Sequence, residues 1–357
     1  MRFVCYLTVR KEQSTRRGTQ TMNAKQQVSM LLEEAGQEYL SGSALAEELG
    51  ITRAAVWKCI RQMEEDGYRV EVTRKGYRLS EESDAISKNA VLRYLGDAAP
   101  LFDVEVLSET DSTNNRLKRM APELKAAGGG ETAPWRTVIA GSQSAGRGRM
   151  GRTFASPAGS GVYLSVFLTP RLSAGQAVRI TTAAAVAACR AIEACTAGES
   201  PERKPSIKWV NDILIDGRKT CGILTEASID LESGGLDWAI MGIGFNVYEP
   251  EGGFPGELQT IAGPIALTRR RDLRSRIAAA FLKSFREVYA DLENGGFAEE
   301  YKARSFLIGR PIYVIRNGEA RPATACGIDD ECRLLVRYED GSSEALSSGE
   351  VSVRPAS

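Results

Sequence analysis

The sequence predicts an α+β protein of three folded parts, and three observations lead to that class. Apolar residues recur at helical spacing in residues 23–80, alternate with period two in residues 87–307, and form short runs between turns in residues 308–357. In the middle part, the expected strands and helices do not alternate strictly, which favours a mixed sheet over a parallel one. The 357 residues are enough to bury a core in each of two or three domains.

The composition excludes several kinds of chemistry. The chain has no histidine, which rules out Ser-His-Asp and Cys-His hydrolases and every zinc site that needs imidazole. Its seven cysteines form no CxxC pair, so we expect reduced, structural thiols. Lys+Arg and Asp+Glu both total 46, so a nucleic-acid site must come from local clustering of cations. No apolar run reaches the ~18 residues of a membrane span and no signal-peptide core is found, so we expect a cytoplasmic protein.

Residues 1–22 are basic and show no helical period. We expect either a disordered extension or a start codon assigned too early, with Met22 as the true start. A DNA-binding arm is the alternative.

Residues 23–80 carry the pattern of a winged helix-turn-helix. A first amphipathic helix ends near Gly36, a short helix covers Ala44–Leu49, and a third helix begins after Thr52. Residues 68–79 then alternate with period two around a turn and predict a β-hairpin. This order of elements is typical of a DNA-reading module.

Cations gather on the third helix and on the hairpin of this module, whereas the residues before them are mainly acidic. The candidate DNA-binding residues are Arg53, Ala54, Trp57, Lys58, Arg74 and Lys75. Side chains at the start of a recognition helix reach base edges, and the cations of the wing contact phosphate. A helical dimerisation or protein-docking module is the alternative.

A polar linker at residues 81–86 leads into the large domain. The expected strands there are Phe102–Leu107, Arg136–Gln143, Val162–Leu168, Ser206–Trp209, Thr220–Ser228 and Leu236–Val247. The expected helices are Thr113–Ala127, Gly175–Cys195 and Asp272–Glu293. After them, residues 308–357 predict a small β-barrel of short strands.

A loop rich in glycine and arginine lies between two of the expected strands. Its sequence, Gln143-Ser-Ala-Gly-Arg-Gly-Arg-Met-Gly-Arg-Thr-Phe154, has GxGxxG spacing but opens no helix, unlike a dinucleotide-binding motif. Glycines let the backbone approach a ligand, and guanidinium groups pair with carboxylate or phosphate. We therefore expect the loop to close over an anionic ligand; a solvated basic turn is the alternative.

Three further runs place polar residues at the ends of expected elements. In Lys208-Trp-Val-Asn-Asp212, the lysine stands between apolar residues, which costs free energy unless an anion meets it. Asn246 ends an apolar strand, and Asp111-Ser-Thr-Asn114 begins a helix whose free N–H groups can receive a ligand. Taken one at a time, the alternatives are an edge-strand lysine for Lys208, a turn cap for Asn246 and a helix cap, which is the default, for Asp111–Asn114.

Together, the four runs resemble the biotin–protein ligase family, and with residues 23–80 they resemble its bifunctional members, the biotin ligase and biotin operon repressors. The resemblance covers residues 24–355 in consistent order, and the GRGRxGR, KWxND and STN segments are specific in combination. It implies a central catalytic domain of the biotin/lipoate ligase type and an SH3-like C-terminal β-barrel.

The resemblance also implies roles for individual residues. The implied biotin-binding residues are Ser112, Thr113, Asn114, Gln143, Arg147, Gly148, Arg149 and Lys208, of which Arg147, Arg149 and Lys208 are also catalytic. Phe154 and Asn246 are similar to residues on the adenosine side. Phe154 stands where the family has a tryptophan, and Val210 replaces a proline. Both departures are apolar, so they put local packing and affinity in doubt and leave the reaction intact.

The implied reaction joins biotin and ATP, both anions, with cations and Mg²⁺ neutralising the charge of the transition state. Biotin then passes from biotinyl-adenylate to a lysine of the biotin carboxyl carrier protein of acetyl-CoA carboxylase. Asp212 is a candidate for holding Mg²⁺ or for deprotonating that lysine, and a turn carboxylate explains it equally well. The implied partners are the carrier domain, operator DNA and a second copy of the chain. A lipoate ligase and a biotin-sensing repressor with little ligase activity remain alternatives.

Overall fold

The computed structural model describes residues 23–128, 133–230, 232–316, 318–347 and 352–355. The chain divides into two compact units, Met1–Ser80 and Glu81–Ser357. The extension expected at residues 1–22 lies outside the described residues. Within the described parts, no helix is both long and apolar enough to cross a membrane.

The first unit is the expected winged helix-turn-helix. Its elements are α2 (Ala24–Ala35), α3 (Gly42–Leu49), α4 (Arg53–Glu65), β1 (Val70–Thr73) and β2 (Gly76–Leu79). The helix α3 begins two residues earlier than expected, because the Ser41 side chain accepts a hydrogen bond from the Ala44 backbone N–H at 3.0 Å. Val28, Leu45 and Met63, one from each helix, meet in the core of the unit.

The second unit is built on a seven-stranded mixed sheet in the order β3-β4-β5-β9-β8-β7-β6. The strands are β3 (Phe102–Leu107), β4 (Trp135–Ala140), β5 (Gly161–Leu168), β6 (Ser206–Lys208), β7 (Asp212–Ile215), β8 (Arg218–Ile229) and β9 (Leu236–Asn246). The pair β3–β4 is parallel, and the other neighbours are antiparallel. The α+β fold class and the mixed sheet are therefore confirmed.

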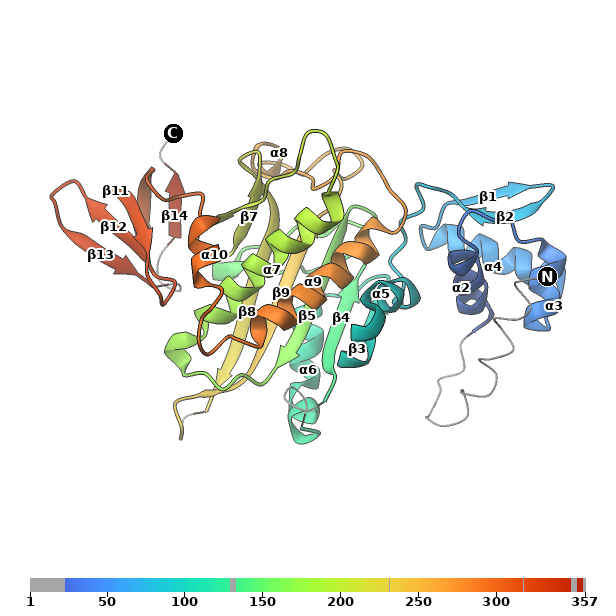
Figure 1. Ribbon diagram of the computed structural model, residues 1–357, viewed down its shortest axis with the longest axis horizontal. Coiled ribbons are helices and arrows are strands. Elements are labelled where there is room, and N and C mark those ends of the chain that lie inside the picture. The colour runs from blue at the N-terminus through green and yellow to red at the C-terminus, as the bar shows by residue number, and fades with distance from the viewer. Residues whose placement is uncertain (1–22, 129–132, 231, 317, 348–351, 356–357) are drawn as a thin grey trace. The chain divides into compact units, whose positions relative to one another are not determined.

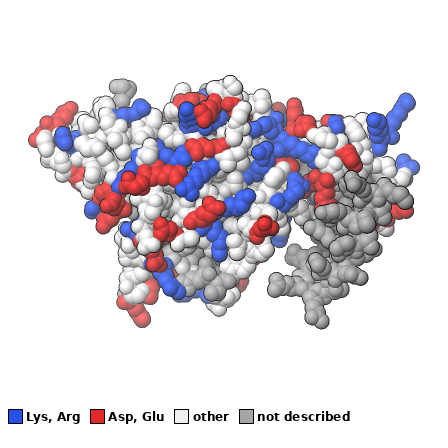
Figure 2. Space-filling model, in the orientation of Figure 1, with Lys and Arg blue, Asp and Glu red and all other residues white. Residues whose placement is uncertain are grey.

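The longer helices cover the two faces of this sheet. The helices are α5 (Lys88–Leu95), α6 (Thr113–Ala126), α7 (Val178–Thr196), α8 (Leu258–Ile261), α9 (Leu273–Tyr289) and α10 (Ala298–Ala303), with short 3₁₀ turns η1 (Gly96–Leu101), η2 (Arg149–Gly151) and η3 (Ala174–Gln176). The helices α7 and α9 lie side by side across one face (Figure 1). The helix α6 packs against β4, β5 and β9 through a separate apolar cluster on the other face. Lys, Arg, Asp and Glu are interspersed over the visible side of this unit, without a large patch of one sign (Figure 2).

The alternation of side chains along β9 determines which residues face each side of the sheet. On β9, Met241, Ile243 and Phe245 point into the core beneath α7 and α9. Gly242 and Gly244 therefore face the α6 side, where their missing side chains leave room above the sheet. Gly242 and Gly244 therefore form part of the wall of the site.

The strand expected at Arg136–Gln143 ends at Ala140 because the chain bends at Gly141. The Gly141 backbone N–H donates to Leu107 O at 2.9 Å, and a Cβ at this glycine would lie 2.9 Å from Ser108 O. The segment that follows is thereby carried out of the sheet towards the start of α6.

The predicted linker packs into the second unit instead of lying free in solvent. Asp84 is 2% exposed, and its carboxylate accepts hydrogen bonds from the Tyr248 hydroxyl at 2.6 Å and the Arg274 backbone N–H at 3.0 Å. At the other end of this unit, the small β domain that the sequence predicted as a β-barrel forms a five-stranded antiparallel sheet. Its strands are β10 (Pro311–Arg316), β11 (Glu319–Ile328), β12 (Leu334–Tyr338), β13 (Ser343–Leu346) and β14 (Ser352–Pro355).

Candidate active site

A cavity of about 770 Å³ opens on the α6 face of the sheet, above the glycines of β8 and β9. Each of the four runs singled out in the sequence contributes to it or to its support. Among the predicted site residues, those that line the cavity are Ser112, Thr113, Asn114, Gln143, Arg147, Gly148, Arg149, Phe154 and Lys208. Asn246, also predicted as a site residue, does not line the cavity. Its side chain donates a hydrogen bond to Lys219 O at 3.2 Å.

The start of α6 forms one end of the cavity. Ser112 is the N-cap, and the Thr113 backbone N–H donates to Gln143 Oε1 at 2.9 Å. The Gln143 amide is fixed at its other end because Nε2 donates to Ser156 Oγ at 2.8 Å. This end therefore presents buried hydroxyl and amide groups, which suit a polar ring without net charge.

Asn114 supports this end of the cavity from below. Its Oδ1 accepts a hydrogen bond from Ser165 Oγ at 2.6 Å, and its Nδ2 donates to Glu226 Oε2 at 2.9 Å. A Cβ on Gly242 would lie 2.0 Å from Asn114 Oδ1, so the asparagine fits because that position is glycine. Both polar groups of Asn114 are thus engaged by protein atoms.

The glycine- and arginine-rich loop folds back on itself beside the cavity. The Gly148 N–H donates to Arg152 O at 2.7 Å, and the Phe154 N–H donates to Gly146 O at 3.0 Å. A Cβ at Gly146 would lie 2.3 Å from Phe154 O, which explains why this bend needs glycine. The loop therefore presents its arginines over the cavity from a compact backbone.

Two of the three arginines of the loop, Arg147 and Arg149, are fixed on opposite sides of the cavity. Arg147 forms an ion pair with Glu226, Nη1 to Oε1 at 2.9 Å. Arg149 donates from Nη1 to Asn211 Oδ1 at 3.2 Å, and burial lowers the pKa of its guanidinium. An anion that enters beside a desolvated guanidinium of this kind stabilises its charge.

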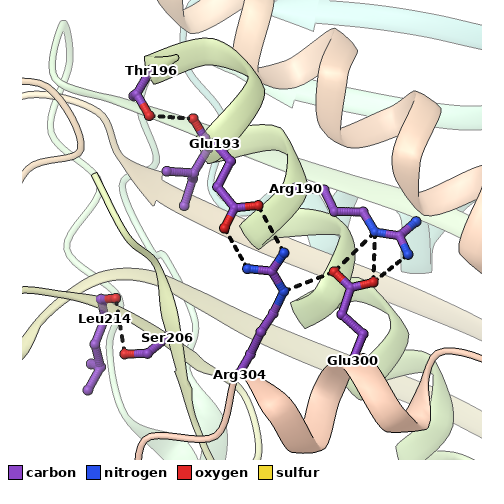
Figure 3. Close-up of polar contacts among 8 residues, drawn as sticks. Arg190, Glu193, Thr196, Ser206, Leu214, Glu300 and Arg304 are labelled. Atoms are coloured by element: carbon purple, nitrogen blue, oxygen red, sulfur yellow. Dashed lines mark hydrogen bonds and ion pairs between the residues drawn. The ribbon is translucent and has the colours of Figure 1, made fainter. Parts of the chain in front are cut away.

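The strand that carries Lys208 is held in place by α10. The Ile207 N–H donates to Arg304 O at 2.8 Å. The Arg304 guanidinium bonds the carboxylates of Glu193 at 2.6 Å and Glu300 at 2.9 Å, which joins α7 to α10 (Figure 3). This bidentate, partly buried network fixes the edge strand β6 and with it the backbone of Lys208.

The segment after Lys208 is fixed by two further long-range hydrogen bonds. Trp209 Nε1 donates to Cys332 O in the C-terminal domain at 2.9 Å, and the Tyr301 hydroxyl donates to Val210 O at 3.1 Å. Val210 is buried, so the departure from the family pattern at this position fits an apolar environment. The C-terminal domain thus helps to shape the wall of the cavity.

Lys219 also lines the cavity, and our sequence prediction missed it. Its Nζ forms an ion pair with Asp212 Oδ1 at 2.7 Å and lies 5.8 Å from the centre of the Phe154 ring. The available signal was a lysine beside a tight turn at the start of β8, but that pattern equally describes a solvated hairpin. Arg149, Arg152 and Lys208 also line the cavity, so Lys219 adds to a group of cations in its wall.

The Phe154 ring occupies the space left by two glycines of the sheet. A Cβ would lie 2.4 Å from this ring at Gly244 and 2.9 Å from it at Gly222. The ring also packs edge-on against Tyr163 at 6.3 Å between centroids. A flat apolar surface beside a cationic region suits a nucleotide base and its phosphates.

Carboxylates are sparse in the wall of this cavity. Asp212 and Glu257 line it, and the described residues contain no cluster of three metal-binding side chains. Asp212 forms an ion pair with Lys219, so it is more than an isolated turn carboxylate. Mg²⁺ keeps several waters and does not need an all-protein cage, so a wall with few carboxylates does not exclude it.

The candidate DNA-binding residues lie on the exposed side of the winged helix-turn-helix. Arg53, Ala54, Trp57 and Lys58 are exposed on α4, opposite its buried face, and Trp57 keeps 54% of its surface. Arg74 and Lys75 are exposed at the turn between β1 and β2. Lys and Arg project at the tip of this hairpin (Figure 2).

Three regions of the chain match family models. Residues 25–78 match an HTH domain, residues 124–246 match the biotin/lipoate A/B protein ligase family, and residues 307–354 match the biotin protein ligase C terminal domain. These matches follow the same order along the chain as the described domains.

Similar proteins cover the whole set of domains or the catalytic part. The bifunctional ligase/repressor BirA of Bacillus subtilis (strain 168) is 34% identical over 331 residues, which is 89% of this chain and 95% of the relative. The biotin–[acetyl-CoA-carboxylase] ligase of Paracoccus denitrificans is 34% identical over 248 residues, which is 66% of this chain and 95% of the relative. The biotin protein ligase from Aquifex aeolicus in complex with biotin and ATP shares the fold, with a TM-score of 0.55, 24% identity and coverage of 71% of this chain and 99% of that one.

Proposed function

Because this chain belongs to the family of bifunctional ligase/repressor proteins, we propose that its cavity binds biotin and ATP and joins them as biotinyl-5′-AMP. The protein is a biotin ligase that uses ATP, with a helix-turn-helix for repression. The observation that carries the site assignment is one cavity with a neutral polar end at Thr113 and Gln143 and a cationic end at Arg149, Lys208 and Lys219. Biotin has the matching halves, an uncharged ring system and a carboxylate.

In this assignment, the polar end receives the ring of biotin. Ser112, Thr113 and Gln143 offer hydroxyl, backbone and amide groups to it, and Asn114 supports them. Arg147, Gly148 and Arg149 cover the ligand, while Phe154 forms the adenosine side; Asn246 supports that side through its bond to Lys219 O.

The reaction brings two anions together, and the cations of the cavity lower that barrier. A carboxylate oxygen of biotin attacks the α-phosphorus of ATP, a P–O bond forms, and the P–O bond to pyrophosphate breaks. Arg149, Lys208 and Lys219 stabilise the charge that builds up on the phosphates. Asp212 would help to hold Mg²⁺, and the ion would supply additional charge neutralisation.

The second step needs no protein nucleophile. The neutral amine of a lysine on the biotin carboxyl carrier protein attacks the carbonyl of the mixed anhydride, the C–O bond to AMP breaks with its electron pair, and the nitrogen releases a proton to leave an amide. The naming of the Paracoccus relative supports acetyl-CoA carboxylase as the source of this carrier. Lipoate activation is not favoured, since the relatives named for a substrate are biotin ligases.

The test is transfer to a carrier domain. The purified protein is incubated with biotin, ATP, Mg²⁺ and an apo carrier domain, and the carrier is weighed by mass spectrometry. We expect a gain of one biotin, lost in Lys208→Ala and reduced in Arg149→Ala, and retained in the control Lys125→Ala on the exposed side of α6. Binding of biotin without transfer would instead support a sensor-repressor with little ligase activity.

For the N-terminal unit, we propose that the adenylate-bound protein dimerises and represses by binding a two-part operator. The exposed Arg53, Trp57 and Lys75 are placed for groove and phosphate contacts. A gel-shift titration with a candidate operator should show tighter binding when biotin and ATP are both present. Analytical ultracentrifugation under the same conditions should show a dimer; equal affinity with and without the ligands would contradict the proposal.

A further inference from the structure

Glu226 lies on β8 just outside the cavity wall and accepts hydrogen bonds from two other elements, the helix α6 and the glycine- and arginine-rich loop. Its side chain is 17% exposed. Lys118 Nζ on α6 donates to Oε1 at 2.6 Å, Asn114 Nδ2 donates to Oε2 at 2.9 Å, and Arg147 Nη1 of the loop lies 2.9 Å from Oε1 and 3.1 Å from Oε2. One carboxylate therefore joins the sheet, the helix and the loop.

This carboxylate is ionised at neutral pH. Burial alone raises the pKa of Glu226, but the hydrogen bonds from Lys118 and Asn114 and the charges of Lys118 and Arg147 outweigh burial and lower it. Two cations thus face one partly buried anion, a strong form of hydrogen bond because both partners are charged. The two cations come from different elements, Lys118 from α6 and Arg147 from the loop.

Arg147 is the link between this cluster and the ligand site. Its guanidinium bonds Asn115 Oδ1 at 3.1 Å as well as Glu226, so its fixed contacts lie on the α6 side of the cavity. Its backbone pairs with Thr153 across the loop, next to Gly148. Fixing the Arg147 side chain therefore also fixes the position of the loop backbone where it passes over the cavity.

We propose that Glu226 is a positioning residue that latches the glycine- and arginine-rich loop to α6 through Arg147 and so retains the adenylate in the cavity. The proposal rests on the proposed function and adds to it a residue that touches neither biotin nor ATP. Its consequence is specific: losing the latch speeds the escape or hydrolysis of bound biotinyl-adenylate more than it slows adenylate formation.

The test uses Glu226→Gln, which keeps the size of the side chain and removes its charge. Protein loaded with labelled biotin and ATP is freed of excess ligand by desalting, and loss of bound label is followed over time. We expect loss about tenfold faster than in the wild type, the size expected for one charged hydrogen bond. Single-turnover adenylate formation should change less than about threefold, because no group that faces the reacting atoms is altered.

A double-mutant cycle separates the latch from a general structural role. Arg147→Gln should speed the loss of label to a similar degree, and Glu226→Gln in that background should add less than about twofold. The matched control is Glu105→Gln, because Glu105 on β3 also bonds a cation of α6, Arg116, but touches no residue of the loop. This control should retain the adenylate as the wild type does.

The outcomes distinguish failure of the latch from failure of the proposed function. If the wild type forms no biotinyl-adenylate, the proposed function fails. If the wild type retains the adenylate and Glu226→Gln retains it equally well, the latch is wrong. Additive effects in the double variant would also overturn it, since Glu226 would then act independently of Arg147. Far-ultraviolet circular dichroism and melting curves establish that each variant is folded.

Discussion

Lys219 Nζ lies 2.7 Å from Asp212 Oδ1, across the hairpin that joins β7 to β8. The backbone register pairs Asp212 with Gly222 and Lys219 with Leu214, so the two side chains meet diagonally. A register shift between Ile213 and Leu214 makes this approach possible. The two side chains therefore neutralise one another's charge in the wall of the cavity.

We predict that Lys219→Ala abolishes most adenylate formation. Removing a cation that faces the reacting phosphates should lower the rate of the first step by about 10²- to 10³-fold, and it leaves Asp212 without its counter-ion. Single-turnover formation of biotinyl-adenylate measures this step directly. Transfer from chemically supplied biotinyl-adenylate should fall much less, and an equal fall in both steps would argue against the assigned role.

Gly244→Ala should weaken ATP binding through Phe154. The new Cβ would lie 2.4 Å from Phe154 Cε1, so the ring must leave its place above the sheet. We expect a KM for ATP raised about tenfold and a free energy of unfolding reduced by about 1–3 kcal/mol, as overpacking usually costs. Biotin affinity, measured by calorimetry without ATP, should change little.

The control for this substitution is Gly175→Ala, because that glycine has no heavy atom near the position of a Cβ. Truncating the ring in a Phe154→Leu/Gly244→Ala double variant should restore stability without restoring ATP affinity. Normal ATP kinetics in Gly244→Ala would show that the Phe154 ring is not part of the nucleotide site.

The stability of the second unit should depend on pH through Asp84. Burial raises the pKa of Asp84 to about 6, although the charge of Arg274 and the hydrogen bond from Tyr248 act in the opposite direction. The unfolded value is about 3.9, so the folded protein binds this proton more tightly than the unfolded chain. Protonation therefore stabilises the fold below the unfolded value, and this contribution is lost as the pH rises through about 6.

Urea denaturation of the wild type and of Asp84→Asn between about pH 4 and 7 measures that contribution, since the variant cannot titrate at this position. Relative to the variant, the wild type should lose stability as the pH rises across this range. Asp216→Asn, an exposed carboxylate with a single ion pair, is the control and should follow the wild-type curve. Parallel curves for Asp84→Asn and the wild type would contradict the prediction.

Two substitutions in the winged helix-turn-helix should weaken DNA binding in different ways. Arg53→Ala, on the exposed start of α4, should lower affinity for the operator by about 1–3 kcal/mol and leave binding to unrelated DNA nearly unchanged. Lys75→Ala, at the hairpin tip, should weaken both and reduce the slope of log affinity against log salt by about one. Fluorescence anisotropy over a range of salt concentrations gives both quantities, with Lys25→Ala as a control in the same unit.

Much of the fold could be predicted from local patterns in the sequence alone. The caps and apolar stripes of α2, α3 and α4, the hairpin after them and the alternating strands of the sheet depend on residues within a few positions of one another. The glycine- and arginine-rich loop was evident for the same reason, because its local composition favours a site for an anionic ligand over a solvated basic turn. The assigned roles of individual site residues, and the boundaries of the domains, stay predictions.

The tertiary structure decided what depends on residues far apart in the chain. Lys219 meets Asp212 through a shifted register, Glu226 collects Lys118 and Arg147 from other elements, and Trp209 bonds Cys332 more than a hundred positions away. Sequence periodicity states which face of an element a side chain occupies, but not which element lies opposite that face. The chain by itself therefore determined the elements and the chemical character of the site, whereas packing determined which charges neutralise one another within it.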